Sequence, residues 1–333
     1  MIEMMEYKPT GMNIELTTCC PLRCPQCYCT LEGGKHIPLD IAKKALDEAA
    51  QLGVEHVELS GGETLCYPHL IELVAYARSQ GIAPNVALSG WHFNDEVLAQ
   101  LTEAGIEGIY ISINGPTKEL NDLSRDGFDF AISALETLKN AGFKRTYINW
   151  VMHRQTADYL PDMIDLAERY CVKCLVILMP KPDAHHELTS LPTVEQMEMA
   201  VDYAKRHKNT ATSVGIENCF SQLLALYCRN PFWGNLNRGV DKGCGAGINA
   251  LNVNVEGQYS PCRHLDLYEQ FDTLQEYWEN STVLNKIRGL DKNAKEPCAT
   301  CQFANYCRHC LAINYKLYGE LLIGNKHCPI NSV

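Results

Sequence analysis

The sequence feature that most constrains this chain is a loop with three cysteines, Cys20, Cys24 and Cys27, separated by three and then two residues. The loop follows a short β-like run, residues 12–17, where a barrel enzyme places its chemistry. Three thiolates at this spacing can wrap one face of an iron–sulfur cube and leave its fourth iron without a protein ligand. An open metal position is typical of catalytic rather than structural sites. The loop therefore favours a reactive metal centre.

Beyond this loop, helix-like and strand-like segments alternate along the chain. Apolar residues at helical spacing predict a helix over 38–52, which Pro38 opens and Gly53 closes. Further helices are predicted at 69–79, 95–104, 128–140, 159–170 and 193–208. Strands are predicted at 12–17, 54–60, 85–88, 109–113, 146–152 and 175–179. Six strands with intervening helices predict a parallel α/β sheet, short of the eight units of a full barrel, with its site at the carboxyl ends of the strands.

A second group of thiols follows where the periodicity changes, after about residue 217. Short apolar alternations predict a β-hairpin that turns at Glu256–Gly257. We therefore expect two domains, 1–216 and 217–333. Seven cysteines lie within 85 residues of the second domain: Cys244, Cys262, Cys298, Cys301, Cys307, Cys310 and Cys328. Thiols at this density in a protein without a secretory signal predict metal ligation, and two four-cysteine sites would need one more ligand or leave one metal position open.

Charge and composition exclude two classes of partner. The formal net charge is −11 and no Lys/Arg-rich block occurs, so a nucleic-acid partner is not expected. The longest apolar runs are strand-sized and interrupted, so neither a transmembrane helix nor a membrane partner is expected. The first seven residues carry acidic side chains and no apolar signal region. These features predict a cytoplasmic protein whose cysteines stay reduced.

The three-cysteine loop resembles the signature of the radical S-adenosylmethionine (SAM) superfamily. In that family the open iron of a [4Fe–4S] cluster chelates SAM, and an electron from the cluster splits the sulfonium to give a 5′-deoxyadenosyl radical that removes a hydrogen atom from substrate. The resemblance implies a partial (β/α)6 TIM-like barrel, in agreement with the six predicted strands. A zinc site is the alternative, although it would want a fourth Cys or His at matched spacing. Cys19 and Cys29 fall outside the spacing and are interpreted as bystanders.

The segment Ser-Gly-Gly-Glu at residues 60–63 resembles the radical SAM GGE motif, which holds the amino group of SAM. Glycines let the backbone approach a ligand closely, and a carboxylate accepts hydrogen bonds from an ammonium group. By the same resemblance an aromatic residue lies beside the adenine, strand-end polar residues contact the SAM carboxylate and ribose, and the sixth strand passes near the adenine. The implied SAM-binding residues are Tyr28, Gly61, Gly62, Glu63, Ser112, Asn114, Arg125 and Leu178. Polar residues expected at the barrel mouth, without an assigned role, are Asn149, Lys181, Asp183, His185 and His186.

The C-terminal cysteines, with Gly257 five residues before Cys262, resemble the SPASM domain, a small extension built from a β-hairpin and short helices that holds two auxiliary [4Fe–4S] clusters. The resemblance implies three ligands for the first auxiliary cluster: Cys244, Cys262 and Cys310. It implies four ligands for the second: Cys298, Cys301, Cys307 and Cys328. Two residues separate the last two cysteines of the central run, where the family usually has three. Either Cys228 completes the first cluster or the fourth iron of that cluster is open. The alternative to auxiliary clusters is a zinc knuckle formed by Cys298, Cys301, Cys307 and Cys310.

Three [4Fe–4S] clusters and SAM together imply a radical SAM/SPASM oxidoreductase. Such proteins mostly modify ribosomally made peptides, and an auxiliary cluster can accept electrons, so we expect oxidative maturation of a precursor peptide through a thioether or C–C cross-link. A separate peptide-recognition protein and an external electron donor of the flavodoxin or ferredoxin type are the expected partners. The alternatives are a dehydrogenase or epimerase of a sugar, aminocyclitol or other metabolite, a formylglycine-generating sulfatase maturase, and a non-catalytic iron–sulfur carrier, which has no need of the GGE motif.

Overall fold

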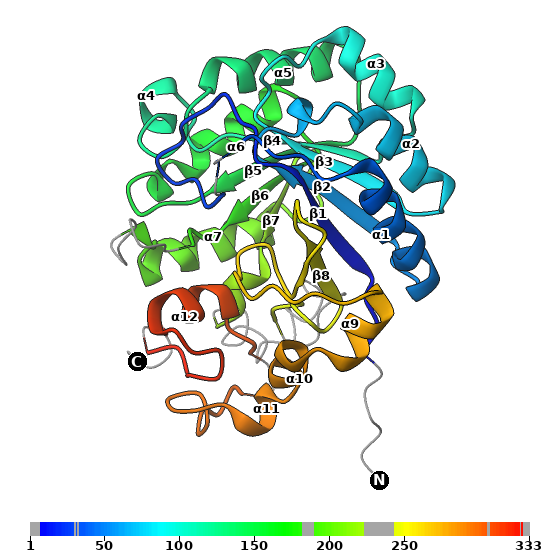
Figure 1. Ribbon diagram of the computed structural model, residues 1–333. Coiled ribbons are helices and arrows are strands. Elements are labelled where there is room, and N and C mark those ends of the chain that lie inside the picture. The colour runs from blue at the N-terminus through cyan, green and yellow to red at the C-terminus, as the bar shows by residue number, and fades with distance from the viewer. Residues whose placement is uncertain are drawn as a thin grey trace.

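A single open sheet organises the part of the chain that the computed structural model describes, residues 7–29, 31, 33–181, 190–222, 243–304, 307–326 and 328. Its strand order is β7-β6-β5-β4-β3-β2-β1-β8-β9, and only β9 runs antiparallel to its neighbour (Figure 1). The strands are β1 (Gly11–Thr17), β2 (His56–Gly61), β3 (Ala83–Leu88), β4 (Gly108–Ser112), β5 (Thr146–Val151), β6 (Cys174–Leu178), β7 (Ser213–Ile216), β8 (Ala250–Val253) and β9 (Tyr259–Ser260).

Helices connect the parallel strands and cover the outer face of the sheet, as expected for right-handed βαβ crossovers (Figure 1). They are α1 (Leu39–Leu52), α2 (Leu70–Ser79), α3 (Asp95–Glu103), α4 (Lys118–Asn121), α5 (Phe128–Asn140), α6 (Leu160–Arg169) and α7 (Val194–Arg206). Short 3-10 turns are η1 (Thr64–Cys66), η2 (Ala157–Tyr159) and η4 (Asn218–Phe220). Within the described ranges, none of the helices combines the length and the apolar character needed to cross a bilayer.

Four further helices follow the hairpin β8–β9 and lie together below the sheet in Figure 1: α9 (Leu274–Asn280), α10 (Thr282–Arg288), α11 (Leu290–Asn293) and α12 (Leu311–Tyr318). Helix α9 docks on α1, because Glu48 of α1 accepts a hydrogen bond from the Leu274 backbone N–H at 2.8 Å. Trp278 of α9 also donates to the Tyr7 carbonyl at 2.9 Å. The C-terminal region is therefore fastened to the first βα unit of the sheet.

The predicted α/β architecture is confirmed, and all six predicted strands are present with ends shifted by one or two residues. The structure adds β7, which the sequence pattern missed. The predicted hairpin is confirmed as β8 and β9, but β8 pairs in parallel with β1 and so extends the sheet. The domain boundary predicted after residue 216 coincides with the end of β7. It stays a prediction.

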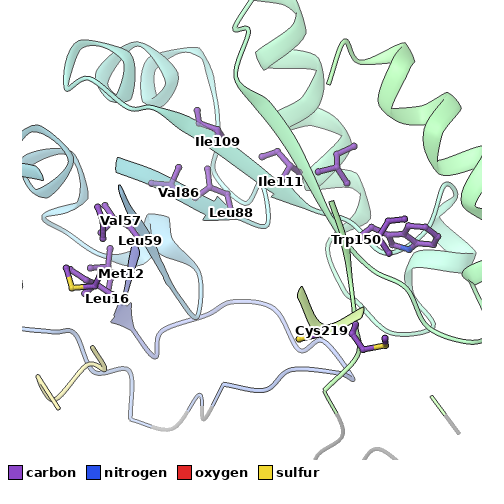
Figure 2. Packing of buried hydrophobic residues seen from close by; sticks show 14 of the residues in the cluster. Met12, Leu16, Val57, Leu59, Val86, Leu88, Ile109, Ile111, Trp150 and Cys219 are labelled. Carbon is purple, nitrogen blue, oxygen red and sulfur yellow. The ribbon is translucent and has the colours of Figure 1, made fainter. Parts of the chain in front are cut away.

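Side chains alternate along β1 and β2, so this part of the sheet has an apolar outer face and a polar inner face. In β1, Met12, Ile14 and Leu16 are buried in the core, whereas Asn13 and Glu15 point to the other side. Figure 2 shows the corresponding apolar residues of β1 to β4 lying across neighbouring strands. The polar inner face is unusual for a parallel sheet buried on both sides. It indicates that the interior of the partial barrel is built to receive a polar ligand.

One buried amide ties β8 and β9 to β1. Asn252 of β8 is fully buried; its oxygen accepts from Asn13 Nδ2 at 2.5 Å, and its nitrogen donates to Glu15 Oε1 at 2.8 Å and to Ser260 Oγ at 3.1 Å. These bonds satisfy polar groups that would otherwise be buried without partners. They also hold the C-terminal hairpin in register with the first strand.

Replacing Asn252 with alanine should lower the free energy of unfolding by at least about 1–3 kcal/mol, the cost of leaving a buried polar group unpaired. Urea denaturation of the cluster-loaded protein, followed by circular dichroism, measures the change. Asn280→Ala, an exposed residue at the end of α9, is the matched control and should leave the midpoint unchanged. Equal midpoints for the two variants would contradict the role given to Asn252.

Candidate functional site

A cavity opens at the carboxyl ends of the parallel strands, where the α/β architecture predicts the site. It encloses about 1210 Å³ of empty volume, its open mouth included. Residues from every parallel strand end of the first domain reach it. The lining includes Cys20, Cys24, Cys27, Tyr28, Cys29, Gly61, Gly62, Ser89, Ser112, Asn114, Arg125, Asn149, His153, Leu178, Lys181, Glu217, Arg263 and His264. The structure thus brings together the three loop cysteines and seven of the eight residues predicted to bind SAM.

The cysteine loop is held by its own backbone and by one arginine. Arg23 Nη1 donates to the carbonyls of Cys20 and Leu22 at 2.8 and 2.7 Å, and the Cys27 N–H donates to the Cys24 carbonyl at 3.1 Å. Burial raises the pKa of the Cys20 thiol to about 11. At neutral pH this thiol therefore keeps its proton until a metal displaces it, as expected for a cysteine ligand. Three thiols on one wall of the cavity fit the three-cysteine ligand set.

The turn after β2 passes directly under this loop. The N–H groups of Gly62 and Glu63 donate to the carbonyls of Thr17 and Cys19 at 2.7 and 2.8 Å. A Cβ atom at Gly62 would lie 2.4 Å from the Cys19 oxygen, a distance that real Cβ atoms do not tolerate. Only glycine fits here, because the two backbones touch. The glycines of the predicted motif therefore bring backbone groups to the cavity wall beside the thiols.

Glu63 does not line the cavity. Its buried carboxylate accepts hydrogen bonds from the Leu65 N–H at 3.1 Å, from the Ser89 N–H at 2.9 Å and from the Ser89 hydroxyl. Burial raises the pKa of Glu63, and these hydrogen bonds oppose the shift. The carboxylate thus fixes Ser89, the residue after β3 that does line the cavity. Glu63, the third residue of the GGE motif, therefore supports the cavity wall through Ser89.

Arg125 carries the clearest signal for an anionic ligand. It lines the cavity, and its buried Nε has no hydrogen-bond partner among the described residues. Asn121 positions it by donating to the Arg125 carbonyl at 2.8 Å. The Asn114 side chain, in contrast, is already engaged, since it accepts from the Val151 N–H at 3.1 Å and donates to Ser124 at 2.9 Å. A free guanidinium donor in a cavity fits a carboxylate such as that of SAM.

Tyr28 lines the cavity and packs against the segment that follows Cys262. Its ring centroid lies 4.3 Å from that of His264, edge to face, and the Arg263 guanidinium lies 5.7 Å from it. Arg263 is anchored in turn by Glu58 of β2 at 2.7 Å. Burial holds the pKa of His264 well below its ordinary value, so the imidazole is neutral, and its Nδ1 has no hydrogen-bond partner among the described residues. Ser112 and Leu178 line the cavity from the ends of β4 and β6.

A lysine–glutamate pair forms the opposite wall. Lys181 Nζ donates to Glu217 Oε2 and to the Met179 carbonyl, both at 2.8 Å, and Glu217 also accepts from the Met179 N–H at 3.0 Å. Although burial works against its charge, the neighbouring Cys219 and Glu217 hold the pKa of Lys181 above its ordinary value. Asn149 lines the cavity as expected. Three other residues expected at the mouth, Asp183, His185 and His186, lie outside the described residues.

Four of the C-terminal cysteines surround a second cavity, of about 790 Å³ of empty volume. They are Cys298, Cys301, Cys307 and Cys328, the set implied for the second auxiliary cluster. The Asn325 N–H donates to the Cys298 sulfur and the Phe303 N–H to the Cys301 sulfur, each at 3.4 Å. Hydrogen bonds of this kind are a usual feature around iron–sulfur ligands. The donor set therefore fits a four-cysteine cluster.

Cys310 lies with the other group of thiols. It interacts electrostatically with Cys244 and Cys262, as implied for the first auxiliary cluster, and also with Cys219. In the described part of the chain, no three Cys, His, Asp or Glu side chains converge closely enough to hold a single metal ion. Cys298, Cys301 and Cys307 line the second cavity together with Cys328, whereas Cys310 does not line it. The zinc knuckle would need Cys310 beside the first three. Cys228, the fourth ligand considered from the sequence, lies outside the described residues.

Several cavity residues were not predicted. Ser89 and His153 follow β3 and β5, so their strand-end positions could have identified them. Arg263 and His264 directly follow a predicted ligand, Cys262, which was the available signal. Glu217 follows β7, and it was missed as a site residue because that strand was missed. Cys29, interpreted as a bystander, lines the cavity and donates to the Gly61 carbonyl at 3.4 Å.

Comparisons with known proteins agree with this geometry. The model of the radical SAM superfamily matches residues 14–167. PqqA peptide cyclase from Rhodopseudomonas palustris is 30% identical over 317 residues, which cover 89% of this chain and 80% of that protein. Mycofactocin maturase MftC from Mycolicibacterium smegmatis is 28% identical over 324 residues, covering 92% of this chain and 79% of that protein.

Among solved structures, Streptococcus suis SuiB bound to S-adenosylmethionine is similar with a TM-score of 0.78 at 17% identity, covering 97% of this chain and 78% of that chain. At this identity the likeness speaks for the fold, a partial barrel with a cysteine-rich extension of the SPASM type. The family follows from the sequence relatives, the matched model and the cysteine loop. The chain belongs to the radical SAM superfamily.

Proposed function

We propose that this protein is a peptide-modifying oxidoreductase that uses SAM to mature a ribosomally made precursor peptide by an oxidative cross-link, a C–C or thioether bond. The observation that carries the proposal is the position of the two groups of thiols. The loop cysteines line the cavity, as do Arg263 and His264, which directly follow Cys262 in the sequence. A substrate in the cavity would lie between a site for radical formation and a site for electron removal.

When bound, an iron–sulfur cluster and SAM supply an electron and the nucleoside radical that takes a hydrogen atom from the substrate. The chain's own residues provide the surroundings. The backbone at Gly61 and Gly62 and the donor of Arg125 suit the amino and carboxylate groups of SAM, while Tyr28 suits its adenine. The Lys181–Glu217 pair presents fixed charges to the polar part of a substrate.

Net oxidation accounts for the extra thiols. A cross-link between two substrate positions removes two hydrogens, one as the abstracted atom and the other as a proton and an electron. The electron needs an acceptor, and the group of Cys244, Cys262 and Cys310 fits that purpose. We infer an external flavodoxin- or ferredoxin-type donor for the first electron. We also infer a reducing, cytoplasmic setting, where thiols remain available as ligands.

The relatives favour a peptide over a small metabolite. Two of them are named as a peptide cyclase and a mycofactocin maturase, and SuiB has been crystallised bound to precursor peptide SuiA. The cavity, at about 1210 Å³ with its mouth, is larger than the space a small cofactor requires. We propose that the remaining space takes a peptide segment, with recognition aided by a separate protein.

Cys24→Ala should reduce cleavage of SAM to 5′-deoxyadenosine by more than about 100-fold, because even changes around metal ligands cost about 10–100-fold. The assay uses anaerobically reconstituted protein with dithionite, and Cys171→Ala, at an exposed thiol, is the control. With a short peptide encoded beside the gene, the product should be lighter by two hydrogens. Intact SAM in the fully iron-loaded protein would contradict the enzyme class; an oxidised metabolite beside an unchanged peptide would favour the small-molecule alternative.

Iron analysis tests the number of clusters. Three [4Fe–4S] clusters require about twelve iron atoms and twelve sulfides per chain. Inductively coupled plasma mass spectrometry on the reconstituted protein measures iron and zinc together. About four irons with one zinc would contradict the auxiliary clusters.

Gly62→Ala should weaken SAM binding by about tenfold or more, since overpacking of this kind costs about 1–3 kcal/mol and the added methyl pushes the cysteine loop away from the turn. Equilibrium dialysis with labelled SAM measures the affinity. Gly215→Ala is the control, because its methyl would meet only the movable Cys174 sulfur, at 3.2 Å. Equal affinities would show that the glycine contact does not position the SAM site.

A further inference from the structure

One thiol near the first auxiliary site has no role so far. Cys219 lies in η4, three residues after β7, and only 5% of its surface is exposed. Figure 2 shows it among the buried residues of the core cluster. Its thiol interacts electrostatically with that of Cys310, which also interacts with Cys244 and Cys262. We propose that Cys219 is the fourth thiolate ligand of the first auxiliary cluster, joining the three cysteines that the sequence pattern implies.

Backbone contacts hold the thiol-bearing segments together independently of any metal. The Arg308 carbonyl accepts from the Cys244 N–H at 3.2 Å and from the Ser221 hydroxyl at 2.5 Å. A Cβ at Gly243 would lie 2.5 Å from the same oxygen, so the segments are in direct contact. Three stretches of chain, 219–221, 243–244 and 307–310, therefore meet at one carbonyl group. Ser221, two residues after Cys219, is part of this junction, so the junction brings the Cys219 segment beside the segments that carry Cys244 and Cys310.

The local electrostatics suit a negatively charged cluster. Four thiolates around a [4Fe–4S] core leave a net negative charge, which is costly to bury without a cation. The Lys181 ammonium interacts electrostatically with both Cys219 and Cys310, and its hydrogen bonds to Glu217 and to the Met179 carbonyl use two of its three N–H groups. The third N–H is available to a sulfur of the site.

A single ion is a poorer occupant of these thiols. No three Cys, His, Asp or Glu side chains within the described ranges approach closely enough for one metal ion. A tetrahedral zinc site needs ligands about 2.3 Å from one centre, whereas a cluster spreads its ligands over four irons.

The inference rests on the proposed function, since it assumes that this auxiliary cluster exists, and it sharpens that function. A site with four cysteine ligands has no open iron, so a substrate cysteine cannot bind there through its thiolate. The site is then an electron acceptor for the substrate radical. This favours a cross-link formed inside the cavity without prior attachment of the substrate to the cluster.

The test compares ligand variants in a full-length parent that lacks the loop cysteines (Cys20→Ala, Cys24→Ala, Cys27→Ala), so that only auxiliary clusters contribute. Cys219→Ala should open one iron; mild ferricyanide oxidation should then give the EPR signal of a three-iron cluster at about one spin per chain. The parent, Cys228→Ala and Cys66→Ala, a control at a half-buried thiol, should not give it. Cys219→Ser, which keeps the side-chain size, should retain the cluster with an altered EPR spectrum of the reduced state.

Three outcomes would overturn the assignment. They are a three-iron signal already present in the parent, a signal produced by Cys228→Ala and not by Cys219→Ala, and a Cys219→Ser spectrum identical to that of the parent. Circular dichroism and gel filtration identify any variant that fails to fold, in which case the serine variant decides. The readout is independent of peptide modification, so an inactive protein with the expected spectra would challenge the proposed function alone. If the parent bound no iron at its auxiliary sites, that result would contradict both the Cys219 assignment and the proposed function.

Discussion

The site depends on one close contact, between the turn after β2 and the loop after β1. Backbone bonds from Gly62 and Glu63 to Thr17 and Cys19 join the two segments with no room for a side chain. This contact fixes the position of the three thiols relative to the carboxyl ends of the strands. Because both segments begin at neighbouring parallel strands, the register of β1 and β2 sets the position of the three loop cysteines.

The polar inner face of the sheet extends this arrangement across the barrel. Glu58 on β2 holds Arg263, which follows β9, and Asn252 on β8 bonds Glu15 on β1. Such pairs add little net stability once the cost of desolvation is counted. Their effect is positional: they bring the segment after Cys262 to the cavity. The C-terminal region and the barrel thus share one wall.

Local features of this fold could be predicted from the sequence, and features that depend on distant segments could not. The cysteine loop and the helix–strand alternation depend on residues that are close together in the sequence. Strand β7 was missed because Val214 and Ile216 alone give it apolar alternation. The pairing of β8 with β1 joins residues almost 240 positions apart and leaves no local pattern.

The same limit applied within the site. The GGE motif was recognised from the sequence. The contact of Glu63 with Ser89, which keeps its carboxylate out of the cavity, could not be predicted from the motif. The neighbour of Cys310 was equally hidden, because Cys219 lies 91 positions upstream in a region without a motif. Spacing identifies ligands that share a loop. It does not identify a ligand supplied by a different strand end.

The division of roles after β9 follows from chain geometry. The Cys262 sulfur accepts the His264 N–H at 3.5 Å and interacts electrostatically with Cys310, while Arg263 and His264 line the cavity. One residue cannot both ligate a metal and contact substrate, so adjacent positions divide the two tasks. An electron leaving the substrate would then cross a single layer of side chains. It follows that substitutions at Arg263 and His264 can alter contacts with a substrate. The predicted ligand Cys262 and its hydrogen bond from the His264 backbone N–H would then be kept.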